Sequence, residues 1–241
     1  MKQQSYGISA TTLRLFALGC MLLDHLWATV VPGNDWMNYL GRLAFPIFAF
    51  QLAEGYLHTR NYEAYRKRLL IFALISEIPF NLMLTGSPIF PFHQNVMLTL
   101  LLGLMAIHQL DVLDGSDSGK VKAKALGKLG LIGLAGVITF PDYGLFGILN
   151  MVGFYVLRNK AFEKPLQLLL MVVIHWYGYQ GMFIPLLDGR IEFPIQAFAI
   201  LALIPIWLYN GQRGKGGKTI QQVSYWFYPV HMLLLGLSLY L

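Results

Sequence analysis

The sequence predicts an all-α integral membrane protein, a bundle of eight or nine transmembrane helices with a cytoplasmic N-terminus. Hydrophobic residues make up 56% of the 241 residues and charged residues only 12%, about half of the roughly 25% that soluble domains carry. Apolar segments of roughly 20 residues, the length that crosses a bilayer, follow one another along the chain. They leave no room for a separate soluble domain, so we expect residues 1–241 to form a single polytopic domain.

The predicted spans are 11–31, 38–57, 66–84, 95–111, 123–140, 143–157, 165–184, 194–210 and 222–241. The sixth is short and follows a tight Phe-Pro-Asp-Tyr connection at 140–143, so the fifth and sixth spans also fit one broken or re-entrant element. The first span lacks a small-residue cleavage site, and we expect it to be retained and not removed as a signal peptide. Cys20 is the single cysteine of the chain, which excludes an intramolecular disulfide.

The distribution of Lys and Arg predicts the orientation. Sixteen of the 18 cationic residues fall on one side of the predicted spans, and the other side holds only Arg42 and Arg190. Cytoplasmic loops of membrane proteins carry such an excess, so the N-terminus is expected inside and, with nine spans, the C-terminus outside. The cations are spread over several short loops, which argues against nucleic-acid binding. The expected location is the plasma or inner membrane of the cell, with the lipid bilayer as partner.

Asp24 and His25 lie next to each other inside the first apolar run. An ionisable pair in hydrocarbon costs a few kcal/mol, so it indicates a functional site by default. Histidine can act as a general base near neutral pH. Neighbouring side chains on a helix do not face each other, and we therefore expect Asp24 to reach another span, with Arg42 as the candidate. Interhelical hydrogen bonds that only hold the bundle are the alternative.

Further polar residues are predicted to lie toward the outer side. The set expected to meet in one outward-facing cavity is Asp24, His25, Arg42, Glu77, His93, Asn95, His175 and His231. Glu77 precedes Pro79, so it is either a second acid/base group or part of a polar kink. His175 adjoins an aromatic run typical of the membrane interface, which favours a structural role.

His231 follows Pro229, and a bend at this proline would turn His231 toward the cavity. A metal site is the alternative for the histidines. The chain has no His-Glu-x-x-His motif, and His25, His93, His175 and His231 come from different spans. We therefore expect no metal.

A second polar group is predicted at the inner side, where Glu54, His58, Arg60, Arg66 and Arg68 mark an inner vestibule. The cations of this group first of all determine topology, but guanidinium groups also form bidentate pairs with phosphate oxygens. The chain contains neither a Gly-x-Ser-x-Gly elbow nor a phosphate-binding loop. This argues against a serine hydrolase of that type and against a P-loop nucleotide hydrolase.

Several stretches together resemble a known family. They are Met21–His25, Gly41–Phe48, Glu54–Arg60, Tyr65–Leu69, Ile75–Pro79, Gln94–Val96 and Phe227–His231. The combination resembles the TraX family, named for the conjugative-pilin acetyltransferase and similar to the broader transmembrane acyltransferase superfamily. The resemblance spans nearly the whole chain and is densest over residues 14–105.

The resemblance implies a membrane acyltransferase that uses cytoplasmic acyl-CoA, such as acetyl-CoA, as co-substrate. The acceptor would carry an amine or hydroxyl at the outer face: a peptide N-terminus, a glycan or a small molecule, with pilin the acceptor of the name-giving member. On matching positions His25 would be the base and Asp24 its companion, with Arg42 and Glu77 nearby. The residues expected around the CoA phosphates are Glu54, Arg60, Arg66 and Arg68. A proton-coupled transporter and a non-catalytic assembly subunit are the alternatives.

Overall fold

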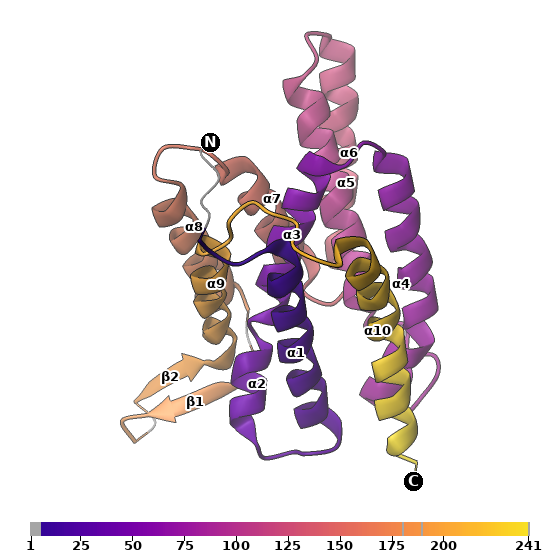
Figure 1. The fold of residues 1–241 in the computed structure, drawn as a ribbon, viewed down its shortest axis with the longest axis vertical. Coiled ribbons are helices and arrows are strands. Elements are labelled where there is room, and N and C mark those ends of the chain that lie inside the picture. Colours follow the sequence, from indigo (N-terminus) through magenta and orange to yellow (C-terminus); the bar gives the residue numbers. More distant parts are fainter. Residues whose placement is uncertain (1–5, 180, 189, 241) are drawn as a thin grey trace.

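Helices make up most of the chain in the computed structural model, which describes residues 6–179, 181–188 and 190–240 (Figure 1). The α-helices are α1 (Ala10–Thr29), α2 (Asp35–Gly41), α3 (Ala44–His58), α4 (Tyr62–Thr85), α5 (Val96–Asp114), α6 (Gly119–Ile138), α7 (Gly144–Leu157), α8 (Glu163–Val172), α9 (Leu203–Trp207) and α10 (Gly217–Ser238). A π-helical segment, Val173–Gly178, continues α8, and a 3₁₀ helix, Ile195–Ala202, leads into α9.

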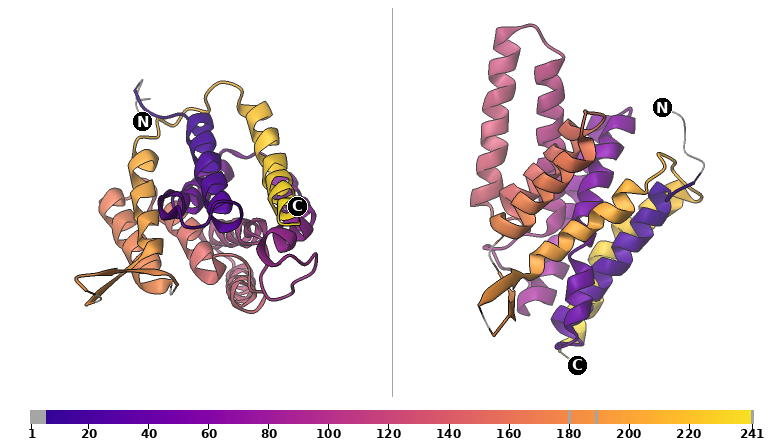
Figure 2. Two further views of the ribbon diagram at one scale, coloured as in Figure 1. Left: turned by 90° about the horizontal axis from the view of Figure 1, so that it is seen from below. Right: turned by 90° about the vertical axis from the view of Figure 1, so that its left-hand side faces the viewer.

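Helix α1 lies at one face of the molecule (Figure 2) and contacts α2, α3 and α10. Helix α4 packs along α10, and α5 contacts α3, α4, α6 and α7. The α5–α6 hairpin projects beyond the other helices (Figure 1). Helices α1, α3, α4, α5 and α10 thus surround one common interior.

The connections between helices gather at two opposite ends of the molecule. The α3–α4, α5–α6, α7–α8 and α9–α10 connections lie at the upper end of Figure 1, and the α1–α2 and α4–α5 connections lie at the lower end with the strands. The upper connections are the cation-rich ones that the sequence predicts to face the cytoplasm. Helix α10 ends at the lower end of the molecule (Figure 1).

The helix boundaries have local causes. Ser9 begins α1, since its hydroxyl accepts from the N–H of Thr12 at 3.2 Å, and Asn61 caps α4 in the same way at 2.9 Å from the N–H of Ala64. Such caps satisfy N–H groups that have no partner inside the helix. Gly86 ends α4 with a left-handed φ of 71°, a conformation that glycine adopts without strain.

The predicted span 38–57 is divided into α2 and α3 by a break at Arg42 and Leu43. Pro46 accounts for the break, because it has no N–H to bond the carbonyl of Arg42 one turn earlier. Within the first turn of α3 the missing donor costs nothing. The break places Arg42 at a corner between the two helices and not on a regular helix face.

The strands are a departure from the predicted all-α fold. β1 (Phe183–Leu186) and β2 (Ile191–Pro194) form an antiparallel hairpin in which Phe183 is opposite Pro194. The chain turns there with positive φ at Leu187 and Asp188. As a result, the predicted span 165–184 ends as a helix at Gly178, and the predicted span 194–210 begins as a 3₁₀ helix after Pro194.

Within the described part of the chain, two helices are both long and apolar enough to cross a membrane, α4 and α5. Helix α7 and the segment Ile195–Trp207 are apolar but shorter. The predominantly helical architecture is confirmed, whereas all the predicted membrane spans stay predictions.

Fully buried apolar side chains fill the centre of the molecule. They include Leu13 of α1, Ile47 of α3, Leu104 of α5, Met151 of α7, Met171 of α8 and Met232 of α10. Close-packed interiors of this kind hold side chains in single rotamers. The polar residues described next are thus held by an apolar surrounding that fixes their positions.

Candidate active site

Asp24 on α1 is bound to Arg42 at the α2–α3 break, in an ion pair whose side chains are each 19% exposed. Its Oδ1 also accepts from Nδ2 of Asn38 at 2.8 Å. Gly41 makes this approach feasible, because a Cβ at that position would overlap the side chain of Asp24. The expectation that Asp24 reaches Arg42 and not its neighbour is confirmed.

His25 points to a different helix, α10. Its Nδ1 lies 2.7 Å from Nε2 of His231, and the two rings are nearly parallel, with centroids 4.9 Å apart. Nδ1 of His231 lies 2.6 Å from the carbonyl oxygen of Phe227, one turn earlier on α10. The ring of Phe227 stacks on that of His231, with centroids 4.6 Å apart. The two histidines form a pair that bridges α1 and α10.

His175 belongs to a second polar network, which reaches Arg42 through Gln196. Arg42 donates to Oε1 of Gln196 at 3.4 Å, and Nε2 of Gln196 lies 3.0 Å from Nδ1 of His175. Nε2 of His175 lies 2.7 Å from the side-chain amide of Asn150. The side chain is fully buried, and side-chain amides contact both of its ring nitrogens. His175 is thus arranged to hold helices together.

Glu77 and Asn95 contact each other at the start of α5. Nδ2 of Asn95 donates to Glu77 at 2.5 Å and to the carbonyl of Ala73 at 2.8 Å. Oδ1 of Asn95 accepts from the N–H of Met97 at 3.0 Å and so caps α5. A carboxylate near a helix N-terminus is stabilised by the helix dipole. This arrangement favours a structural interpretation of Glu77 over an acid/base role.

His93, expected in the same cavity, lies in the α4–α5 connection and contacts Asp142 at 3.5 Å. Asp142 raises the pKa of His93 through a hydrogen bond and its charge. The outward polar residues do not all touch one another, although the charge of Asp142 acts on Asp24, Arg42 and His93 alike. They divide into the Asp24–Arg42 pair with its Gln196–His175 extension, the His25–His231 pair, the Glu77–Asn95 cap and the His93–Asp142 contact.

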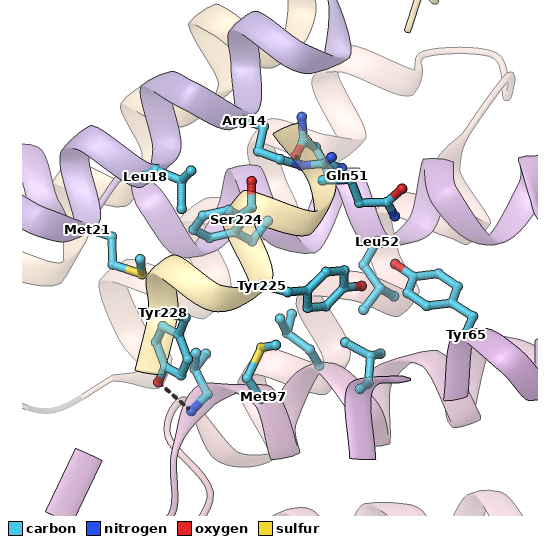
Figure 3. A pocket seen from close by; sticks show the side chains of 15 residues that line it. Arg14, Leu18, Met21, Gln51, Leu52, Tyr65, Met97, Ser224, Tyr225 and Tyr228 are labelled. Atoms are coloured by element: carbon cyan, nitrogen blue, oxygen red, sulfur yellow. Dashed lines mark hydrogen bonds between the residues drawn. The ribbon is translucent and has the colours of Figure 1, made fainter. Parts of the chain in front are cut away.

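A cavity of about 100 Å³ lies between α1, α3, α4, α5 and α10. Arg14, Gln51 and Tyr65 line one end of it, and Met21 and Tyr228 line the other (Figure 3). Met21 precedes His25 by four residues and Tyr228 precedes His231 by three. Residues at these spacings are neighbours on one helix face. The end of the cavity at Met21 and Tyr228 therefore lies one helical turn from both imidazoles.

The opposite end of the cavity adjoins a vestibule of about 440 Å³, because Arg14, Gln51, Tyr65 and Gln221 line both spaces. In the described part of the chain, three arginines line this vestibule: Arg14 of α1, Arg68 of α4 and Arg213 of the α9–α10 connection. Gln51 fixes one of them, accepting from Nε of Arg14 at 3.3 Å.

Two tyrosine rings hold Arg68 in the vestibule, and the carboxylate that lines it, Glu54, is already paired with another arginine. The guanidinium of Arg68 lies over the rings of Tyr65 and Tyr225, at 5.1 and 5.2 Å from their centroids. Glu54 also lines the vestibule, but it already accepts from Nε of Arg158 at 2.5 Å. The vestibule therefore keeps an excess of positive charge, which suits a polyanionic ligand.

The structure separates the cations predicted to act together. Arg68 lines the vestibule, but Arg66 is half exposed and pairs with Glu63 at 2.7 Å. Arg60 is exposed, and neither it nor Arg66 is among the described residues that line the two connected spaces. Sequence reasoning missed Arg14 and Arg213 as vestibule residues, because they are remote in the chain and each was interpreted only as a topology signal.

Comparisons with known proteins agree with the resemblance noted in the sequence. The model of the family described as TraX protein matches residues 9–238. The chain is similar to the "Probable fimbrial assembly protein FimC, serogroup H1" of Dichelobacter nodosus, with 28% identity over 258 residues that cover 96% of each chain. No solved structure matches it.

Proposed function

The chain belongs to the TraX family, and we propose that it is a multi-pass membrane acyltransferase that uses acyl-CoA. It moves an acetyl or another acyl group from the cytoplasmic side to an amine or hydroxyl of an acceptor. One observation carries the proposal: an arginine-lined vestibule adjoins a cavity whose far end, at Met21 and Tyr228, lies one helical turn from the partly buried His25–His231 pair.

The membrane arrangement rests on composition and on the distribution of charge. The cation-rich connections share one end of the molecule (Figure 1), and this end becomes cytoplasmic under the positive-inside rule. Side chains such as Leu74 and Ile78 of α4 and Leu131 and Leu134 of α6 are exposed. Contact with lipid would cover these surfaces, and a multi-pass bundle in the cell membrane follows.

The vestibule and the cavity suit the two ends of the donor. The phosphates of CoA would meet Arg14, Arg68 and Arg213, since guanidinium groups bind phosphate oxygens strongly. The thioester arm would extend through the cavity toward Met21 and Tyr228. Eleven residues separate Arg14 from His25 on α1, a distance of ~16 Å along a helix. An extended pantetheine arm has the same order of length.

His25 supplies the base in this proposal. Its Nδ1 faces His231, and Nε2 has no hydrogen-bond partner in the described part of the chain. Nε2 takes the proton of the acceptor N–H or O–H while the acceptor attacks the thioester carbonyl. The C–S bond then breaks, and the CoA thiolate receives the proton back from His25. No covalent enzyme intermediate is needed.

The acceptor is proposed from the comparison alone. The relative from Dichelobacter nodosus bears the name of a fimbrial assembly protein, which supports a pilin-like subunit as the acceptor. The same name also favours a competing function, in which the protein assists assembly without any chemistry. The two proposals differ in whether acyl-CoA is consumed.

Transfer from labelled donor separates the two functions. Purified protein in detergent or nanodiscs is given [¹⁴C]acetyl-CoA and a pilin-type subunit from the same source, and both labelled subunit and released CoA thiol are measured. We expect label on the subunit and thiol release in equal amounts, with both lost in His25→Gln. Binding of the subunit without any thiol release would replace the proposal with the assembly role.

A further inference from the structure

We infer that His231 is a positioning residue that fixes His25 as the Nδ1–H tautomer, with the lone pair on Nε2. Only one part of the inference rests on the proposed function: the use of the Nε2 lone pair to take the proton of the acceptor. The tautomer itself follows from the hydrogen bonds of the pair, which hold whatever the reaction is.

The direction of the hydrogen bonds begins at Phe227. Its carbonyl oxygen can only accept, so Nδ1 of His231 must be the donor in the 2.6 Å contact. A neutral imidazole with its proton on one nitrogen has a lone pair on the other. Nε2 of His231 is then the acceptor in the 2.7 Å contact with His25. Nδ1 of His25 must donate, and its Nε2 is left as the basic nitrogen.

Packing prevents His231 from turning out of this arrangement. The ring of Phe227 stacks on that of His231 with centroids 4.6 Å apart and a tilt of 13°, and the ring of His25 lies edge to edge with it, tilted by 5° with centroids 4.9 Å apart. The residue is 6% exposed. A flipped ring would direct a carbon at the Phe227 carbonyl and leave that buried hydrogen bond unmade, which is unfavourable.

Asp24 does not perform this task, although it is next to His25 in the sequence. Its carboxylate accepts from Arg42 and from Asn38, and it points to the α2–α3 break. His25 thus has a neutral imidazole as its partner, where many catalytic histidines have a carboxylate. This partner sets the tautomer without adding a negative charge.

The tautomer matters because the wrong one presents a hydrogen where the substrate proton must go. In serine proteases, a wrong tautomer of the catalytic histidine lowers kcat about 10⁴-fold. In His231→Leu, the acceptor for Nδ1–H of His25 is removed and the ring can take either tautomer. In His231→Gln, the side-chain oxygen lies near the place of Nε2 and can still accept from His25.

Nitrogen NMR tests the tautomer directly. Protein with ¹⁵N-labelled histidine is studied in detergent micelles, and the His25 signals are identified as those absent from His25→Gln. We expect the neutral Nδ1–H pattern in wild type and in His231→Gln, and a mixture of tautomers in His231→Leu. His93→Gln, which changes a distant histidine in the α4–α5 connection, should leave the His25 signals in place. A wild-type His25 with its proton on Nε2 would overturn the inference.

Turnover provides the second measurement. We expect kcat of acyl transfer to fall in His231→Leu by the factor by which NMR shows the Nδ1–H tautomer to be depleted, and to stay near wild type in His231→Gln, with the KM for acetyl-CoA unchanged in both. Folded His231→Leu with wild-type kcat would overturn the role of His231. If wild-type protein transfers no acyl group, the proposed function fails, whereas the NMR result still decides the tautomer. If His231→Leu does not fold, the NMR tautomer of His25 in wild type and in His231→Gln still tests the inference.

Discussion

Arg42 binds the carboxylate of Asp24 across the break between α2 and α3, and Gln196 connects the same arginine to His175. The charged residue beside the proposed base thus belongs to a network that joins α1, the α2–α3 corner and the segment after the hairpin. This finding assigns Asp24 to stability more than to chemistry.

Asp24→Asn should destabilise the protein and leave kcat per folded molecule near wild type, because it strands the charge of Arg42. Removing one partner of a buried ion pair costs about 3–5 kcal/mol, and the 19% exposure of both side chains places the expected loss below that range. Thermal unfolding in detergent measures it. The double variant Asp24→Asn/Arg42→Gln should recover part of the loss. An unchanged Tm with a much lower kcat would instead return Asp24 to the catalytic role.

Gly41→Ala should also destabilise the protein, because its new Cβ would overlap Asp24. A matched control is Gly127→Ala in α6, where a Cβ would have no atom within 4 Å. Alanine is favoured over glycine inside a helix by roughly 0.5–1 kcal/mol, so the control should be neutral or slightly stabilising. Equal Tm changes in the two variants would contradict the close approach of Asp24 to Gly41.

Arg14→Gln should raise the KM for acyl-CoA more than it lowers kcat, because its guanidinium lines both the vestibule and the cavity. A hydrogen bond to a charged group contributes about 1.5–3 kcal/mol, so binding should weaken about tenfold or more. Arg66→Gln is the control, since Arg66 pairs with Glu63 outside the vestibule. If Arg66→Gln weakens binding as much as Arg14→Gln, the vestibule is not the CoA site.

His25→Ala should abolish most transfer while CoA binding stays near normal, because the base acts on the acceptor. General-base assistance contributes roughly 10²–10⁴-fold to rate. His25→Gln should not rescue activity, since an amide can hydrogen-bond but cannot take up the proton. Single-turnover transfer and CoA titration measure the two effects separately. Near-full transfer by a folded His25→Ala protein would exclude His25 as the base.

The His93–Asp142 contact should make stability depend on pH. The hydrogen bond and charge of Asp142, with a smaller contribution from Glu77, raise the pKa of His93 above its ordinary value of 6.5. The contribution of His93 to the stability of the folded protein is therefore fully present below the unfolded-state pKa of His93. It is lost as pH rises through the higher folded-state pKa. The Tm difference between wild type and His93→Gln should be larger at pH 5.5 than at pH 8.5. A difference that grows toward alkaline pH would contradict the sign of this shift.

The sequence alone determined the features that depend on local pattern. Apolar runs located most helices to within a few residues, as for α1, α4, α5 and α7, and the cations identified the end of the molecule at which each connection lies. The cost of placing charge among apolar residues selected Asp24, His25 and His231 before any contact was known. Proline and glycine effects were visible in part, but Pro46 was not recognised as the break that positions Arg42.

Tertiary structure decided which residues meet. Helical periodicity tells which face a side chain occupies but not which helix lies opposite, so it could not pair His25 with His231 or separate Glu77 from them. For the same reason Arg60, Arg66 and Arg68 looked equivalent in the sequence, although only Arg68 points into the vestibule that Arg14 and Arg213 complete. The β1–β2 hairpin was likewise missed, because its short apolar strands have the composition of a helix end. Contacts between segments far apart in the chain depend on packing distances, which a single sequence does not contain.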